Sequence, residues 1–131
     1  MCSSDLLLGP MLMCQDVLPW MLHLGKGQIV NVLSIAAEVP FSGGAAYGAA
    51  KAGMLHFGRA LAAEYRSKGI RITSLLPGST DTPLWEGKEW VPPREDMLSS
   101  HAVAEMIRDL IRMPSDRTID HLVLMPPKGV L

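Results

Sequence analysis

The most informative part of this sequence is the stretch Tyr47-Gly48-Ala49-Ala50-Lys51. On a helix, residues four apart lie on the same face, so the phenol of Tyr47 and the ammonium of Lys51 are expected side by side. A neighbouring cation favours the phenolate form of a phenol, which makes the hydroxyl usable as a general acid or base. Many exposed helices carry a Tyr and a Lys at this spacing, so the pair alone is weak evidence for a catalytic site. The segments around it decide the interpretation.

Two buried-strand patterns flank this helix. Residues 28–33 are short, β-branched and apolar, and they end at Ser34. Residues 70–76 repeat the pattern and are followed by Pro77, Gly78, Thr80 and Thr82. Apolar runs of this kind indicate parallel strands covered on both faces. Because open α/β sheets bind ligands at the carboxyl ends of their strands, the residues after both strands are candidates for a site.

The ordered set of strand, Ser34, loop, Tyr-x-x-x-Lys helix, strand and Pro-Gly-x-x-x-Thr resembles the short-chain dehydrogenase/reductase family. The resemblance runs from about residue 7 to about residue 126 and covers the second half of that family's domain. It implies an α/β fold, namely a partial doubly wound Rossmann-type parallel sheet made of the last three strands with their flanking helices. Residues 1–131 are therefore expected to form a single partial NAD(P)-binding domain. The expected strands are 28–33, 70–76 and 121–125, in this order, and the expected helices are about 6–23, 45–67 and 100–112.

The resemblance also implies a chemistry, the interconversion of a carbonyl and a secondary alcohol with NAD or NADP, NADP being slightly favoured. Tyr47 would be the general acid/base, Lys51 would support it and hydrogen-bond the nicotinamide ribose, and Ser34 would hold the carbonyl oxygen. The residues expected to contact the cofactor are Tyr47, Lys51, Pro77, Gly78, Thr80 and Thr82. A plainer alternative for Ser34 is a strand-end serine bonded to backbone.

Two departures from the family pattern bear on activity. No G-x-x-x-G-x-G or G-x-G-x-x-G pattern lies between a strand and a helix, so the turn that would seat a pyrophosphate is missing. The register of Leu8 and Gly9 places Leu6 where many relatives have an asparagine that completes a proton relay. Residues 1–5 have also lost the family pattern. These departures predict a truncated chain, and they give an alternative function: a non-catalytic remnant that keeps the subunit-contact helices.

The composition excludes other classes of function. With 48% hydrophobic and 19% charged residues, the chain is typical of globular proteins. A net charge of −1 with mixed signs offers no basic patch for nucleic acid. The four histidines share no metal-ligand spacing, so no metal site is expected. Two cysteines without a secretory signal indicate free thiols and a reducing compartment, the cytoplasm.

Residues 6–24 are strongly apolar and allow two interpretations. One is a signal peptide or membrane span. Against it stand charges and prolines within or beside the run, namely Asp5, Asp16, Pro10 and Pro19, and the lack of a preceding basic region. We therefore expect a helix buried on most sides, and no membrane association.

Two further segments leave alternatives open. Residues 45–67 are rich in Ala and Gly, and in the family this helix contacts a symmetry mate, which implies a homodimer or homotetramer of the full-length form. An alanine-rich core helix fits the same residues. The connection at 83–99 is long, which favours a functional lid or a floppy segment over a plain turn. The family resemblance implies that this region covers the substrate. Its Trp85 and Trp90 are candidates for a substrate wall, although either could instead fill the core.

Overall fold

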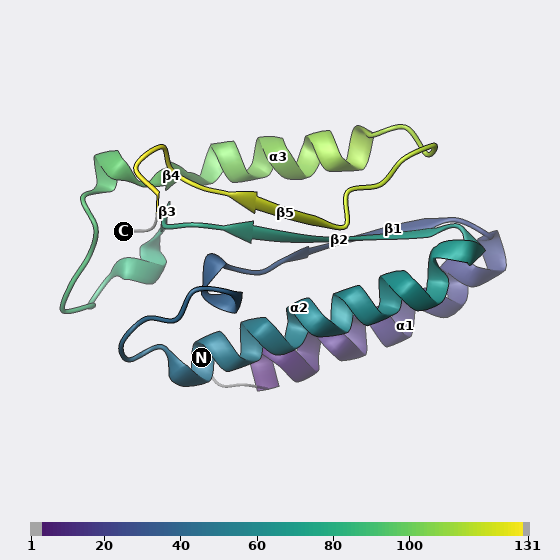
Figure 1. The fold of residues 1–131 in the computed structure, drawn as a ribbon, viewed down its shortest axis with the longest axis horizontal. Coiled ribbons are helices and arrows are strands. Elements are labelled where there is room, and N and C mark those ends of the chain that lie inside the picture. Colours follow the sequence, from purple (N-terminus) through teal and green to yellow (C-terminus); the bar gives the residue numbers. More distant parts are fainter. Residues whose placement is uncertain (1–3, 130–131) are drawn as a thin grey trace.

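The computed structural model describes residues 4–129. Its main sheet is parallel and has the order β1-β2-β5, with bounds Gly27–Val32, Ile70–Pro77 and His121–Leu124. Helices α1 (Gly9–Leu24) and α2 (Ala45–Tyr65) cover one face, and α3 (Ser100–Arg112) covers the other (Figure 1). The strand order, the parallel pairing and the three helices confirm the fold expected from the sequence.

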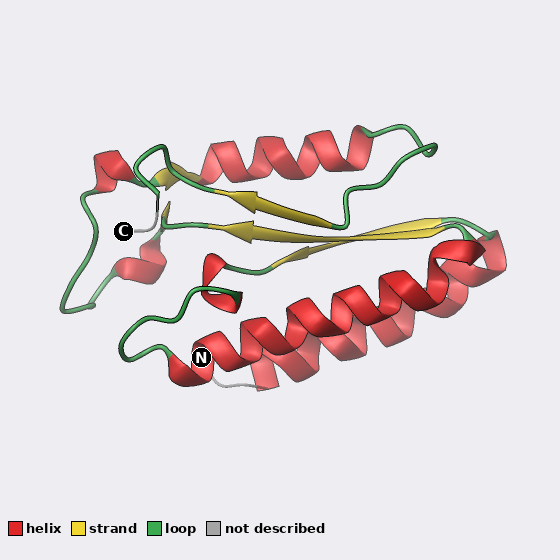
Figure 2. Ribbon diagram, in the orientation of Figure 1, coloured by secondary structure: helices red, strands yellow, loops and turns green. Residues whose placement is uncertain are grey.

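Short elements complete the chain. A π-helical turn, η1 (Ser4–Leu8), runs directly into α1, and residues 1–3, which were expected to depart from the family pattern, lie outside the described part. The 3-10 turns are η2 (Ile35–Ala37), η3 (Arg66–Lys68), η4 (Pro83–Trp85) and η5 (Arg94–Asp96) (Figure 2). Strands β3 (Thr80–Asp81) and β4 (Leu98–Ser99) pair in parallel, a small sheet that the sequence did not predict. This pairing closes the connection 83–99 at its base.

Strand β2 is the centre of the core. Ile72, Leu75 and Leu76 are at most 2% exposed, because β2 has a strand on each side and helices on both faces. Toward α1 and α2 it contributes to two apolar clusters. One contains Cys14, Leu18, Leu61, Ala62, Ile70 and Ile72, and the other contains Leu33, Met54, Leu55 and Leu76.

Helix α1 is less enclosed than expected. Of its residues only Cys14 and Leu18 are buried, whereas Leu12, Met13 and Trp20 are exposed. The expectation of a helix buried on most sides was therefore wrong. The reason is the position of α1 beside β1, the edge strand, where no further element covers its outer side. Within residues 4–129, no helix has both the length and the apolar character needed to cross a membrane.

The glycines of α2 are explained by contacts inside this chain. A Cβ on Gly48 would lie 3.2 Å from the carbonyl oxygen of Ala36, and one on Gly53 would lie 3.2 Å from the side chain of Leu7. A Cβ on Gly58 would lie 3.0 Å from the hydroxyl of Ser74. These distances show that α2 packs closely on η1, η2 and the sheet. These three glycines therefore have a structural role that is independent of any subunit contact.

The start of α3 provides a first testable prediction. The side chain of Ser99 accepts a hydrogen bond from the backbone N–H of Ala102 at 3.0 Å, which caps the helix. We expect Ser99→Ala to lower the free energy of unfolding by about 1 kcal/mol, the usual value of such a cap. Urea denaturation of both chains measures the change. Ser100→Ala is the matched control, because it removes a neighbouring hydroxyl inside the helix; an equal loss in both variants would contradict the assignment.

Candidate active site

The structure brings Tyr47 and Lys51 together on the first turns of α2. The ammonium nitrogen of Lys51 lies 5.7 Å from the centroid of the Tyr47 ring, and both side chains are half-buried. Phe41 also lies beside Tyr47, with its ring centroid 6.3 Å from that of Tyr47 and the planes at 60°. The juxtaposition expected from the four-residue spacing is thus present.

The environment of Lys51 is unfavourable for its charge. Burial lowers the pKa of the Lys51 amine below its ordinary value of 10.5. A partly desolvated ammonium interacts more strongly with an adjacent phenol or hydroxyl than one in water. Keeping a lysine at such a position costs stability, which is a common feature of functional groups.

Ser34 follows the carboxyl end of β1 and caps η2. Its hydroxyl oxygen accepts a hydrogen bond from the backbone N–H of Ala36 at 3.1 Å. The plainer expectation, a serine bonded to local backbone, therefore describes its resting contact. This contact uses the oxygen as an acceptor and leaves the O–H hydrogen able to donate to another group. Because η2 packs against Gly48 of α2, the turn of Ser34 is connected directly to the helix of Tyr47.

The segment after β2 forms a tight turn at the same end of the sheet. The N–H of Gly78 donates to the carbonyl of Leu124 at 2.8 Å, and a Cβ on Gly78 would come within 2.8 Å of the Met125 sulfur. The hydroxyl of Thr80 donates to the carbonyl of Gly78 at 3.0 Å. The close packing explains why a glycine follows Pro77. The carboxyl ends of β1, β2 and β5 all point toward the side where this turn and the connection 83–99 lie (Figure 1).

The two tryptophans of the connection differ. The indole N–H of Trp85 donates to the carbonyl of Thr80 at 2.8 Å, which anchors this half-buried side chain to the turn after β2. Trp90 is exposed. Thr82 precedes η4, and its side chain makes no capping hydrogen bond there. Trp85 thus stabilises the turn, whereas Trp90 does not fill the core.

A cluster formed by Glu38, on the connection between Ser34 and Tyr47, with Arg59 and His121 was not predicted from the sequence. Glu38 lies 2.8 Å from Nε2 of His121 in an ion-pair approach without hydrogen-bond geometry, and 3.7 Å from Arg59 of α2. The cluster ties this connection to both α2 and β5. Its three members are far apart in the sequence, so only the strand order reveals it.

Two cavities lie away from Tyr47. One, of about 760 Å³, runs between α1 and β1, and another, of about 830 Å³, lies at the amino ends of β1 and β2. Neither is lined by Ser34, Tyr47 or Lys51. In the described part of the chain, no three His, Cys, Asp or Glu side chains form a group that could hold a metal ion.

Comparison with known proteins identifies the family. The family model for short chain dehydrogenases matches residues 6–90, so this chain belongs to the short-chain dehydrogenases, an oxidoreductase family with a Rossmann-type fold. D-threitol dehydrogenase of Mycolicibacterium smegmatis is 41% identical over 90 residues, which are 69% of this chain and 34% of that protein. The mouse protein inactive hydroxysteroid dehydrogenase-like protein 1 is 38% identical over 101 residues, 72% of this chain and 31% of that one.

Solved structures agree with this membership. Serine dehydrogenase from Escherichia coli matches with a TM-score of 0.77 and 27% identity, over 91% of this chain and 49% of that chain. The closed form of serine dehydrogenase complexed with NADP+ shares the fold, with a TM-score of 0.78 and 24% identity, over 91% of this chain and 52% of that chain. The chain thus spans about half the length, or less, of the curated relatives and solved structures that it matches.

The lowered pKa of Lys51 gives a prediction for stability. Because the folded chain binds this proton less tightly than the unfolded chain, the protonated amine opposes folding at pH 7. The penalty is lost as the pH rises through the window between the lowered pKa and 10.5. We therefore expect Lys51→Met to have a thermal midpoint no lower than the wild-type chain at pH 7, with any advantage shrinking toward pH 10. Thermal melts across this pH range test it; a midpoint several degrees below wild type at pH 7 would contradict it.

Proposed function

We propose that this chain is the catalytic half of a short-chain dehydrogenase that interconverts a carbonyl and a secondary alcohol. The observation that carries the proposal is the Tyr47–Lys51 pair at the start of α2, near the carboxyl ends of a parallel sheet, in a chain of this family. This is the edge at which open α/β sheets bind ligands. The pairing of a phenol with a partly desolvated ammonium is suited to general acid/base catalysis.

Each side chain has a defined task in this proposal. The hydroxyl of Tyr47 donates its proton to the substrate oxygen as the carbonyl becomes an alcohol, and it accepts the proton in the reverse direction. Lys51 stabilises the phenolate that remains on Tyr47. Ser34, whose oxygen already accepts from Ala36, directs its own hydrogen to the substrate oxygen and holds it beside Tyr47.

In this proposal the site contacts only one end of the cofactor, the nicotinamide with its ribose. NAD or NADP supplies the hydride when bound, and a solved neighbour is a complex with NADP+. Lys51 has ammonium donors for ribose hydroxyls, and the compact turn at Pro77 and Gly78, with Thr80 and Thr82, would border the nicotinamide. No glycine-rich turn between a strand and a helix is present to hold the pyrophosphate.

A second candidate function is a non-catalytic remnant that associates through its retained helices. The missing glycine-rich turn and Leu6 in the place of a relay asparagine favour it. A matched mouse relative is named inactive hydroxysteroid dehydrogenase-like protein 1, which supports a non-catalytic function. The family resemblance implies that α2 also contacts a symmetry mate. For both candidate functions, the full-length form would then be a homodimer or homotetramer.

Turnover separates the two candidates. We expect a version completed with a cofactor-binding half to reduce carbonyl compounds with NADPH or NADH. The reaction is measured as the loss of nicotinamide absorbance. The proposal requires that this activity depend on Tyr47. Activity that is indifferent to Tyr47, or no reduction of any compound in a broad carbonyl panel by a version that binds the cofactor, would favour the remnant.

A further inference from the structure

The connection between Ser34 and Tyr47 begins as a hydrogen-bonded turn. The N–H of Ala36 donates to the hydroxyl oxygen of Ser34 at 3.1 Å, and the N–H of Glu38 donates to the carbonyl of Ile35 at 3.0 Å. Glu38 is the residue that ends η2, the turn that Ser34 begins. Because these bonds link both ends of η2, a displacement of Glu38 is expected to change the position of the Ser34 hydroxyl.

The side chain of Glu38 reaches two other elements. Its Oε1 lies 2.8 Å from Nε2 of His121, the first residue of β5, and 3.7 Å from Nη2 of Arg59 on α2. Since β2 separates β1 from β5, the contact with His121 spans the central strand of the sheet (Figure 1). Glu38 therefore joins the turn after β1 to the far strand of the sheet and to the helix of Tyr47.

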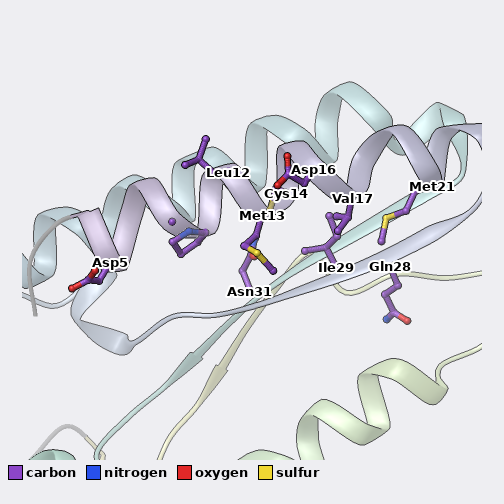
Figure 3. Close-up of a pocket in the computed structure, with 12 residues that line it drawn as sticks. Asp5, Leu12, Met13, Cys14, Asp16, Val17, Met21, Gln28, Ile29 and Asn31 are labelled. Atoms are coloured by element: carbon purple, nitrogen blue, oxygen red, sulfur yellow. The ribbon is translucent and has the colours of Figure 1, made fainter.

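Burial of the histidine nitrogen gives this contact its importance. In the described part of the chain, the buried polar side-chain atoms without a hydrogen-bond partner are Asn31 Nδ2, Thr118 Oγ1 and His121 Nε2. Asn31 lines the groove between α1 and β1 (Figure 3), and Thr118 lines the cavity at the amino ends of β1 and β2. The His121 atom instead lies against the Glu38 carboxylate. A buried polar atom without a partner is unfavourable, so this contact favours one position of Glu38.

We propose that Glu38 is a positioning residue: His121 and Arg59 hold its carboxylate, and through η2 it sets the orientation of the Ser34 hydroxyl beside Tyr47. Glu38 has no task in proton transfer here. Its effect on catalysis rests on the function proposed above, whereas its effect on the turn of Ser34 does not.

Amide hydrogen exchange in the full chain tests the effect on the turn. The reporter is the amide of Ala36, which is bonded to the Ser34 hydroxyl. We expect Glu38→Ala and His121→Ala to speed its exchange about tenfold or more, because the turn opens locally more often. The amide of Leu75, in the buried centre of β2, should keep its rate.

Two further variants make the result specific. Asp120→Asn is the matched control, because the Asp120–Arg66 pair, at 2.8 Å, also joins α2 to the start of β5 but lies outside η2. Glu38→Gln keeps an oxygen that can accept from Nε2 and loses the charge toward Arg59, a weak interaction at this exposure. We therefore expect Asp120→Asn to leave Ala36 exchange unchanged and Glu38→Gln to restore most of the protection.

Three results would overturn the proposal. They are unchanged exchange of the Ala36 amide in Glu38→Ala, an equal rise in Asp120→Asn or at Leu75, and no rescue by Glu38→Gln. An equal rise at Leu75 would mean that the substitution lowers the stability of the whole chain and does not act on the turn of Ser34.

Kinetics in a version completed with a cofactor-binding half test the effect on catalysis. We expect Glu38→Ala to lower kcat by about 10- to 10²-fold, because misplacing a reacting group by ~1 Å can have an effect of this size. Cofactor affinity should not change. An unchanged kcat would overturn the positioning role. If the unmutated version reduces no carbonyl compound, the proposed function fails, and the exchange of the Ala36 amide still decides whether Glu38 holds the turn.

Discussion

In a form completed by a cofactor-binding half, Tyr47→Phe is expected to lower kcat by about 10²- to 10⁴-fold, the range for losing a general acid/base. The substitution removes one hydroxyl and keeps the ring that packs beside Phe41. Cofactor affinity should therefore change little. Steady-state kinetics and a fluorescence titration of the cofactor measure the two effects separately.

Two control variants make this result specific. Lys51→Ala should harm both turnover and cofactor binding, because Lys51 serves the phenol and the ribose. Tyr65→Phe is a matched control, since Lys68 lies 5.6 Å from the Tyr65 ring in a similar cation–ring pair at the far end of α2. Near-normal turnover in Tyr47→Phe, or an equal loss in Tyr65→Phe, would show that the proton donor was wrongly assigned.

Much of the fold could be predicted because its signals are local. The strands at 28–33 and 70–76 are short apolar runs, and the helix at 45–67 ends before Gly69, which adopts a positive φ of 81°. Parallel order follows from the helix between them, since parallel strands need such a crossover. The Tyr47–Lys51 contact is also local, because the helix period alone sets it.

The features that could not be predicted depend on contacts between distant segments. Strands β3 and β4 contain two residues each and have no pattern of their own. The Glu38–His121 approach exists only because β5 lies beside β2. The exposure of α1 was missed because its sequence is as apolar as that of an enclosed helix, and only the open edge of β1 leaves its outer side uncovered.

The second large effect is expected for the 131-residue chain alone: it should be catalytically silent. Hydride transfer needs the nicotinamide held at a near-attack distance of roughly 3–3.5 Å. The residues proposed for the cofactor, Lys51 and the turn from Pro77 to Thr82, would contact only its nicotinamide end. The pyrophosphate and adenosine would have no glycine-rich turn to bind them. Most of the binding free energy that positions the ring is thereby lost, and poor positioning lowers the rate as well.

Titration of the purified chain with NADPH and NADH, by calorimetry and fluorescence, measures this directly. We expect no cofactor binding of micromolar affinity, that is, none with a binding free energy of about −8 kcal/mol. We also expect no reduction of any carbonyl compound. Micromolar binding together with carbonyl reduction by the chain alone would contradict the prediction, and would mean that the segment around Tyr47, Lys51 and Gly78 positions a nicotinamide without help from its phosphates.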